Sequence, residues 1–183
     1  MRNKLLEAVV FAAEAHKHQK RRGKQGSYIC HPLRVCAALS AAGAPEVAVI
    51  AGVLHDTVED TEVTIAEIET LFGGAVAEVV SQVTDDDTLP REERKQATID
   101  KALVLSNHAA LVKLADCLDN RRDMINRPPK GRPQEMVDRY LVYTEKVLLN
   151  LVEADRGKEW TDTARRVVES ANSDMAEQLR RRL

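Results

Sequence analysis

Residues 47–60 read VAVIAGVLHDTVED, and this stretch decides the expected fold. From 47 to 54 nearly every side chain is apolar, so a helix formed here has no polar face. A helix that is apolar all round is buried inside a protein. The polar continuation, HDTVED at 55–60, then leaves the core at the end of that helix. The stretch therefore predicts a core helix that delivers ionisable groups to one place.

Four of those groups have the spacing of neighbours on a helix. Residues four apart lie one above the other, which places His55 over Glu59 and Asp56 over Asp60. Several carboxylates in a partly dry site are unfavourable unless a cation or hydrogen-bond donors satisfy them. The spacing HDxxED after an apolar helix thus indicates a metal- or proton-binding site.

Outward from this stretch, apolar residues recur with a helical period along nearly the whole chain. Thr64 with Glu67 three residues later predicts a capping box. His16 and His18, near the end of the first helix, are expected to face solvent or to support a site indirectly. The expected helices cover about 3–20, 31 up to Gly43, 45 through the polar end HDTVED at 55–60, 64–72, 75–84, a segment from near Pro90, 107–125, 133–154 and 160–183. We therefore predict an all-α single domain over residues 1–183, a bundle of about eight to ten helices.

Composition excludes several classes of protein. The chain has 183 residues with 27 Lys and Arg against 29 Asp and Glu, a net charge of −2, unlike a basic protein that coats nucleic acid. No apolar run approaches the ~18 residues of a transmembrane helix. The three cysteines are odd in number and not in CxxC spacing, which argues for a reducing compartment. We expect a cytoplasmic protein that binds a small molecule and neither nucleic acid nor membrane.

Charge is unevenly distributed. Residues 16–34 contain several Lys and Arg and no acid, whereas residues 53–70 contain six acids and no base. The first segment could hold phosphate and the second a metal ion. The alternative is that both are solvated faces of opposite sign.

A second polar stripe accompanies the first. Asp116, Asn120 and Asp123 recur at positions i, i+4 and i+7 of an expected helix. His31, which follows the basic loop, adds an imidazole from a third helix. Together with His55, Asp56 and Asp116, it makes a set of two nitrogen and two oxygen donors. Such a set suits Mn²⁺, Fe²⁺ or Zn²⁺ with room for water, and the lack of thiolate spacing argues against a closed structural zinc site.

Several strings, in this order and spacing, carry a family resemblance. They are AAEAHKHQKRR (12–22), SYICHPLRV (27–35), AGVLHDTVEDTEVT (51–64), LFGGAVAEVVSQVTDD (71–86), LPREERK (89–95) and LVKLADCLDNRRD (111–123). The chain resembles the hydrolase domain of the RelA/SpoT family, within the HD-domain phosphohydrolases, and is most similar to the stand-alone small alarmone hydrolases. The resemblance is strongest over residues 11–125 and fades in the C-terminal helices, 133–183.

The resemblance implies a manganese-dependent hydrolase that removes the 3′ pyrophosphate of guanosine 3′,5′-bis(diphosphate), (p)ppGpp, and releases GDP or GTP. One divalent ion is implied, Mn²⁺ with Fe²⁺ or Zn²⁺ as alternatives, and a homo-oligomer is compatible with it. The matching metal ligands are His31, His55, Asp56 and Asp116. The pair that orients or activates water is Glu59 and Asp60. The matching substrate contacts are Arg21, Arg22, Arg91, Asn120 and Tyr140.

Several positions depart from the family pattern, including Ser27, which stands where Pro is common, in a loop after Arg22 that is one residue shorter. Asp119 stands where the family has an aromatic residue or His, Cys117 replaces Lys, and Arg121 replaces an apolar residue. None of these residues is an implied ligand or belongs to the acidic pair. Two other functions remain open on the same scaffold: a phosphatase for the 2′-phosphate of NADPH or another nucleotide phosphohydrolase, and a non-catalytic module that binds alarmone or a partner. The family's synthetase domain is not expected in this chain.

Overall fold

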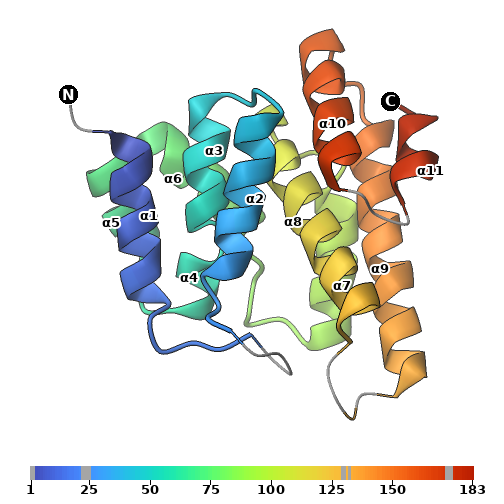
Figure 1. Ribbon diagram of the computed structural model, residues 1–183, viewed down its shortest axis with the longest axis horizontal. Coiled ribbons are helices and arrows are strands. Elements are labelled where there is room, and N and C mark those ends of the chain that lie inside the picture. The colour runs from blue at the N-terminus through green and yellow to red at the C-terminus, as the bar shows by residue number, and fades with distance from the viewer. Residues whose placement is uncertain (1–2, 22–25, 129–130, 132, 172–174) are drawn as a thin grey trace.

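The computed structural model describes residues 3–21, 26–128, 131, 133–171 and 175–183. Within these ranges the chain forms eleven α-helices and no β-strand, which confirms the predicted all-α fold (Figure 1). The helices are α1 (Lys4–Ala15), α2 (Cys30–Ala41), α3 (Glu46–Leu54), α4 (Thr57–Asp60), α5 (Ile65–Phe72), α6 (Gly74–Val83), α7 (Arg91–Lys101), α8 (Asn107–Asn126), α9 (Gln134–Glu153), α10 (Lys158–Ala171) and α11 (Ala176–Arg180).

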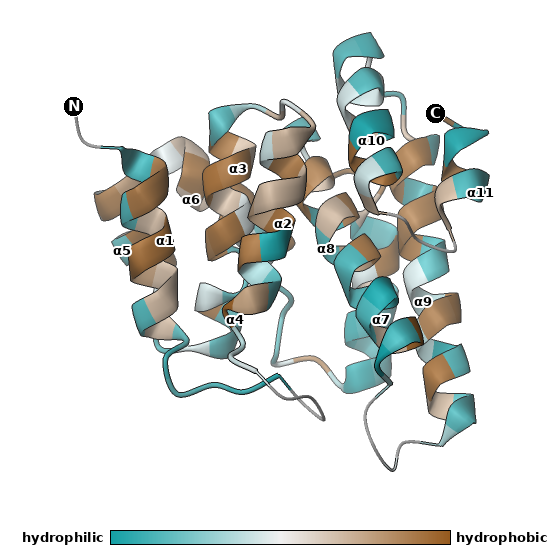
Figure 2. Cartoon of the chain, viewed as in Figure 1, coloured by the Kyte–Doolittle hydropathy of each residue, from teal (hydrophilic) through white to brown (hydrophobic). Residues whose placement is uncertain are grey.

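Helix α3 lies in the core, as its apolar sequence predicts. Most of the helix is coloured as hydrophobic in Figure 2. It is buried continuously from Ala48 to Leu54 and packs against α1, α2, α6 and α8. Gly52 lets α2 approach closely, because a Cβ atom built at this position would lie 2.6 Å from Leu39 Cδ1. None of the helices in the described ranges has the length and apolar character needed to cross a bilayer.

Helix ends follow the predicted capping chemistry in the middle of the chain. The Thr64 side chain accepts from the Glu67 backbone N–H, and the Glu67 carboxylate accepts from Thr64 N, which confirms the capping box. Gly73, with φ of 96°, separates α5 from α6. This positive φ favours glycine, since other residues are strained there.

The first helix is shorter than predicted. It ends at Ala15 rather than near residue 20, and His16 caps it with a non-helical ψ of 8°. The following segment turns back, so that Tyr28 N donates to Gln19 O at 3.1 Å. This turn buries His16 completely beneath the ring of Tyr28, 4.9 Å away between centroids. The solvent-facing alternative for His16 is therefore wrong.

The helix that carries HDTVED is also interrupted. Helix α3 ends at Leu54, and α4 is a separate single turn that begins at Thr57. The Thr57 hydroxyl donates to Leu54 O at 2.7 Å and so satisfies a carbonyl at the end of α3. The predicted continuous helix through residue 60 is wrong. The break lets His55 and Asp56 both turn toward the site described below.

The C-terminal segment, predicted as one helix over 160–183, contains two helices. Helix α10 packs against α8 and α2, and α11 packs against α10 and α9. Residues 172–174, between them, lie outside the described ranges. Burial of Met175, Ala176 and Leu179 explains the reversal, because a straight helix would carry these apolar side chains away from the core.

Candidate metal centre

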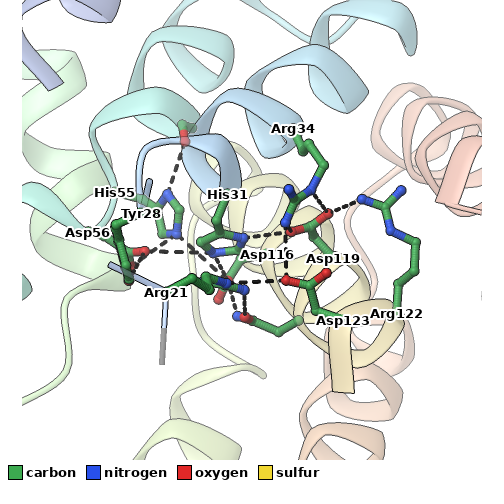
Figure 3. A network of polar contacts seen from close by, with 12 residues as sticks. Arg21, Tyr28, His31, Arg34, His55, Asp56, Asp116, Asp119, Arg122 and Asp123 are labelled. Atoms are coloured by element: carbon green, nitrogen blue, oxygen red, sulfur yellow. Dashed lines mark hydrogen bonds and ion pairs between the residues drawn. The ribbon is translucent and has the colours of Figure 1, made fainter. Parts of the chain in front are cut away.

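Four predicted ligands lie close together, although two separate helices and a turn supply them (Figure 3). His31 stands in the first turn of α2, His55 and Asp56 lie between α3 and α4, and Asp116 lies in the middle of α8. His31 Nε2 is 3.1 Å from an Asp116 carboxylate oxygen and 3.6 Å from one of Asp56. His55 Nε2 is 3.1 Å from the other Asp56 oxygen and 3.7 Å from Asp116.

These distances fit His31, His55 and Asp116 as ligands of one small cation, with Asp56 oxygens beside the two imidazoles. Donor atoms held about 2.1 Å from a metal at right angles lie about 3 Å from each other. One atom each of His31, His55 and Asp116 lies within 4.8 Å of the other two. In addition, His55 Nε2 is buried and has no hydrogen-bond partner. A buried polar atom without a partner is unfavourable, and a cation at this point would remove that cost.

The charges of the cluster are mutually stabilising. Burial opposes ionisation of Asp56, but His55 and His31 outweigh it and hold the pKa of this carboxyl well below its usual range. Burial likewise opposes ionisation of Asp116, whose pKa is nevertheless kept low by Lys113 and the two histidines. The Lys113 ammonium lies 3.5 Å from Asp116 Oδ2. Both aspartates are therefore carboxylates, the form that binds a metal.

The orientation of each imidazole is set at its Nδ1 atom. His55 Nδ1 lies 2.9 Å from the carbonyl oxygen of Gly52, which can only accept a hydrogen bond. Nδ1 of His55 must therefore carry the proton. His31 Nδ1 lies 2.7 Å from Asp119 Oδ2. Both rings thus direct Nε2 toward the cluster, the usual arrangement of metal-binding histidines.

Asp119 is itself held by arginines. Arg34 donates from Nε and Nη2 to its two oxygens at 2.8 Å each, and Arg122 donates to Oδ1 (Figure 3). Arg34 also reaches Asp123 at 3.2 Å. Burial opposes the charge on Asp119, but His31 and Arg34 hold the pKa of Asp119 well below its usual range.

Tyr28 joins the loop after α1 to the site. Its hydroxyl donates to Asp56 Oδ2 at 2.7 Å, and burial together with Asp56 raises the pKa of Tyr28 well above its usual range. His16 packs on this ring, and Gln19, which accepts from His16 Nδ1 at 2.7 Å, donates to the backbone carbonyl of Asp60. His16 therefore contacts the site indirectly, through Tyr28 and Gln19, which agrees with the supporting role expected as one alternative from the sequence.

The acidic pair lies on α4, beside the ligands. Glu59 is exposed, and one carboxylate oxygen accepts from Asp85 N at 3.1 Å. The chain packed around this carboxylate disfavours its charged form, and Asp85 and Asp56 add negative charge, which raises the pKa of Glu59 to about 7. A carboxylate with this pKa can accept a proton near neutrality. Asp60 is also exposed, at the end of the same turn.

Two predicted substrate contacts, Arg21 and Asn120, are linked to each other and to Asp116. Arg21 donates from Nε to Asp123 at 3.2 Å and from Nη2 to the Asn120 side-chain oxygen. The Asn120 amide in turn donates to Asp116. Arg21 is therefore held beside a candidate metal ligand through one intervening side chain. Arg22 lies outside the described residues.

The other two predicted contacts lie on different helices. Tyr140, on α9, is half-buried, and burial together with the charge of Asp116 raises its pKa well above the usual value. Its ring centroid is 6.1 Å from that of Tyr143. Arg91 is exposed in the first turn of α7. The structure thus links Arg21 to Asp116 through Asn120, and the Asp116 charge reaches Tyr140, whereas Arg91 has no contact with the candidate ligands among those described.

Sequence reasoning missed three supporting residues: Tyr28, Arg34 and Asp119. Asp119 had a local signal, since it stands three residues after Asp116 and so lies on the same side of α8. Tyr28 and Arg34 had only their nearness to His31 in the chain. Their partners are far away in sequence, so no periodic pattern points to them.

Comparison with known proteins is consistent with this geometry. The family model of the HD domain matches residues 8–144. A guanosine-3′,5′-bis(diphosphate) 3′-pyrophosphohydrolase, MESH1, from Danio rerio is 44% identical over 150 residues, which cover 80% of this chain and 83% of that protein. The human protein of the same name is 43% identical over 155 residues, or 83% and 87% of the two chains.

More distant relatives and solved structures agree. The bifunctional (p)ppGpp synthase/hydrolase SpoT of Escherichia coli is 35% identical over 136 residues, 70% of this chain but 19% of that protein. A solved metazoan SpoT orthologue, described as hydrolysing ppGpp, superposes with a TM-score of 0.81 at 35% identity, covering 94% of this chain and 97% of its own. A Listeria monocytogenes structure superposes with a TM-score of 0.61 at 33% identity, covering 75% and 95%.

Proposed function

This chain belongs to the HD domain family, and from that premise we propose that it hydrolyses (p)ppGpp at the 3′ position, releasing pyrophosphate and GDP or GTP. By removing the alarmone it would lower the signal of the stringent response. The observation that carries the proposal is the group formed by His31, His55 and Asp116, with Asp56 beside both imidazoles and a buried His55 Nε2 that has no hydrogen-bond partner. The named relatives cover most of both chains, which supports the same substrate.

The donor set supports a divalent transition metal, and we propose Mn²⁺, with Fe²⁺ or Zn²⁺ able to replace it. Two imidazoles and two carboxylates match the mixed nitrogen and oxygen ligands that such ions take. When bound, the ion would lower the pKa of a water molecule and neutralise charge that develops on the phosphate. Proton transfer, orientation of the water and binding of the phosphates are assigned to side chains of this protein.

Glu59 is the proposed general base. Its pKa of about 7 leaves a large fraction ionised at neutral pH, ready to accept the proton of the attacking water. The water oxygen forms a bond to the phosphorus attached to O3′, and the bond from that phosphorus to O3′ breaks. O3′ takes a proton as pyrophosphate leaves. Asp60, on the same turn, is proposed to orient the water.

Arg21 is proposed to hold phosphate oxygens of the substrate. A guanidinium has five N–H donors in a planar fork, so contacts to Asp123 and Asn120 leave others for phosphate. Arg22 and Arg91 are proposed as further phosphate contacts. Asn120 and Tyr140, which lie near Asp116, are proposed to contact the nucleotide.

Product analysis tests the reaction. The protein is stripped with chelator, resupplied with Mn²⁺ and incubated with ppGpp, and the products are separated by anion exchange. We expect metal-dependent release of pyrophosphate and GDP, lost in both Asp56→Ala and Glu59→Ala. Glu177→Gln, which changes a surface carboxylate paired with Arg180 and Arg181, is the control.

The same assay separates the alternative substrates. NADPH, which would lose its 2′-phosphate as orthophosphate, and deoxynucleotide monophosphates are run beside ppGpp. A rate on NADPH equal to or above that on ppGpp would contradict the proposal as stated. Release of orthophosphate from ppGpp would mean that water attacks a different phosphorus.

The remaining features of the proposal concern the whole protein. We propose one HD domain over residues 1–183, a cytoplasmic location and a small-molecule substrate as the main partner. Nucleic acid and membrane are not proposed as partners. Self-association into a homo-oligomer is compatible with the proposal and is measured by sedimentation.

A further inference from the structure

Asp119 makes an unusually complete set of contacts for a residue outside the proposed ligands. It is buried on α8, and each of its two oxygens accepts a hydrogen bond from the Arg34 guanidinium, one from Nε and one from Nη2, at 2.8 Å. Arg122 donates a third hydrogen bond to this carboxylate. The remaining strong contact is with His31 Nδ1, at 2.7 Å (Figure 3). A buried carboxylate with these partners is tightly restrained.

The contact matters because a neutral imidazole carries only one proton. In His31, Nδ1 faces Asp119 while Nε2 faces Asp116, so carboxylates on both sides compete for that proton. A metal ion can bind Nε2 only if the proton stays on Nδ1. The group that holds Nδ1–H therefore helps to decide whether His31 is a metal ligand.

The two histidines of the site have different hydrogen-bond acceptors at Nδ1. His55 Nδ1 faces the backbone carbonyl of Gly52, which no side-chain substitution removes. His31 depends on a side chain, and that side chain stands where the resembled family has an aromatic residue or His. The arrangement at His31 is thus a property of this chain's own sequence and its Arg34 partner.

We propose that Asp119, held by Arg34, is a positioning residue that keeps the proton of His31 on Nδ1 and so presents Nε2 to a divalent cation. The inference rests on the metal-dependent function proposed above. Carboxylate partners of metal-binding histidines typically change metal affinity by about 10–100-fold when mutated. Arg34 contributes by balancing the charge of Asp119 and restricting its rotation.

The test measures Mn²⁺ affinity by titration calorimetry in the absence of substrate. Asp119→Asn keeps the volume but removes the charge that Arg34 balances, and we expect the Mn²⁺ dissociation constant to rise by about 10–100-fold. Asp123→Asn is the matched control, because Asp123 is also a buried acid on α8 that contacts Arg34, whereas the contact with His31 Nδ1 is made by Asp119. It should keep the wild-type affinity.

A second readout reports the tautomer directly. ¹⁵N NMR of the imidazoles, at a pH where the rings are neutral, should show His31 protonated on Nδ1 in the wild type and mixed in Asp119→Asn. At saturating Mn²⁺ we expect the variant to recover most of its kcat with little change in the KM for substrate. Wild-type metal affinity with an unchanged tautomer in Asp119→Asn would overturn the proposal.

Three further outcomes are also decisive. If Asp119→Asn does not fold, Arg34→Gln takes its place, and we expect a smaller loss of Mn²⁺ affinity. An unchanged Mn²⁺ affinity in Arg34→Gln would overturn the positioning role. If the wild type binds no divalent cation, the metal-dependent function fails, and the tautomer of the metal-free protein still decides whether Asp119 controls His31. A loss of affinity in Asp123→Asn equal to that in Asp119→Asn would also overturn the proposal, since a general structural effect would then explain both.

Discussion

The pKa values of two carboxyl groups three residues apart, Asp56 and Glu59, are shifted in opposite directions by their neighbours. His55 and His31 keep the pKa of Asp56 low despite its burial, whereas the chain packed around the Glu59 carboxylate and the nearby acids raise the pKa of Glu59 to about 7. Environments that push the pKa values of neighbouring groups apart separate their chemical roles. Asp56 is suited to remain charged beside a cation, and Glu59 is suited to exchange a proton.

Glu59 is therefore expected to leave a signature in the pH dependence of the reaction. The base acts only when deprotonated, so kcat/KM should rise with pH through the pKa of Glu59. A bound cation adds positive charge, which places this limb at or somewhat below pH 7. Glu59→Gln should lower kcat by about 10²–10⁴-fold and abolish the limb.

Rates measured from pH 5 to 9 on the metal-loaded enzyme test this prediction. Glu62→Gln, which changes an exposed acid three residues along, is the control. Retention of the acid limb in Glu59→Gln would assign the proton to another group.

Arg21 is expected to act through the shape of its guanidinium as well as its charge. It contacts Asp123 and Asn120 with different nitrogens, and a lysine ammonium cannot reproduce this fork. A hydrogen bond to a charged group contributes about 1.5–3 kcal/mol, so Arg21→Lys should raise KM by about 10–100-fold. Arg127→Lys, at an exposed arginine 3.3 Å from the same Asp123, should leave KM unchanged in steady-state assays. An unaltered KM in Arg21→Lys would remove this residue from substrate binding.

At the scale of elements, the site depends on how closely α2 and α3 approach each other. Gly52 provides this approach, and its carbonyl also accepts from His55 Nδ1. One backbone position therefore controls both helix packing and the orientation of a candidate ligand. Helix α8 completes the site with acids that repeat at each turn.

Gly52→Ala should destabilise the protein although alanine favours helices. The helix preference would contribute about 1 kcal/mol of stability, but a Cβ atom would meet the fully buried Leu39 at 2.6 Å, and overpacking costs about 1–3 kcal/mol. We expect a lower free energy of unfolding in urea and weaker Mn²⁺ binding. Gly74→Ala is the control, since its Cβ would meet only an ordinary contact at 3.6 Å. Equal or greater stability of Gly52→Ala would contradict the close packing.

At the scale of the whole molecule, Arg156 connects the ends of several helices. It donates to the carbonyls of Leu151, Leu105 and Ala102, and its guanidinium lies 5.3 Å from the Trp160 ring centroid. It thus joins the end of α9 to the segment between α7 and α8, and to α10. A network of this kind stabilises the arrangement of helices far from the ligands.

Arg156→Met should therefore reduce stability without changing chemistry. Loss of hydrogen bonds from a charged donor costs about 2–3 kcal/mol here, which corresponds to a fall in Tm of about 4–12 °C for a chain of this size. Differential scanning calorimetry measures the fall, with the exposed Arg181→Gln as control. A large loss of kcat at a temperature where the variant is folded would show that Arg156 also acts on the site.

Metal binding should stabilise the whole fold, because the candidate ligands come from α2, the α3–α4 turn and α8. An ion present at about a hundred times its Kd adds about 2.7 kcal/mol, or about 5–11 °C in Tm. Thermal melts with Mn²⁺ and with chelator measure this shift, and His31→Ala should abolish it. A melting temperature that ignores Mn²⁺ in the wild type would favour the non-catalytic binding module.

The amino-acid sequence alone determined the helical class, the buried core helix and the identity of the candidate ligands. These properties are local: apolar period predicts helices, and His31, HDxxED and Asp116 stand in short, ordered motifs. Only the tertiary structure decided that His16 is buried, that Arg21 is tied to α8 and that the last predicted helix reverses. It also decided that His31 meets Asp119, 88 residues away. The physical reason is that period and residue chemistry act within a few turns, whereas such contacts depend on how separate helices pack together.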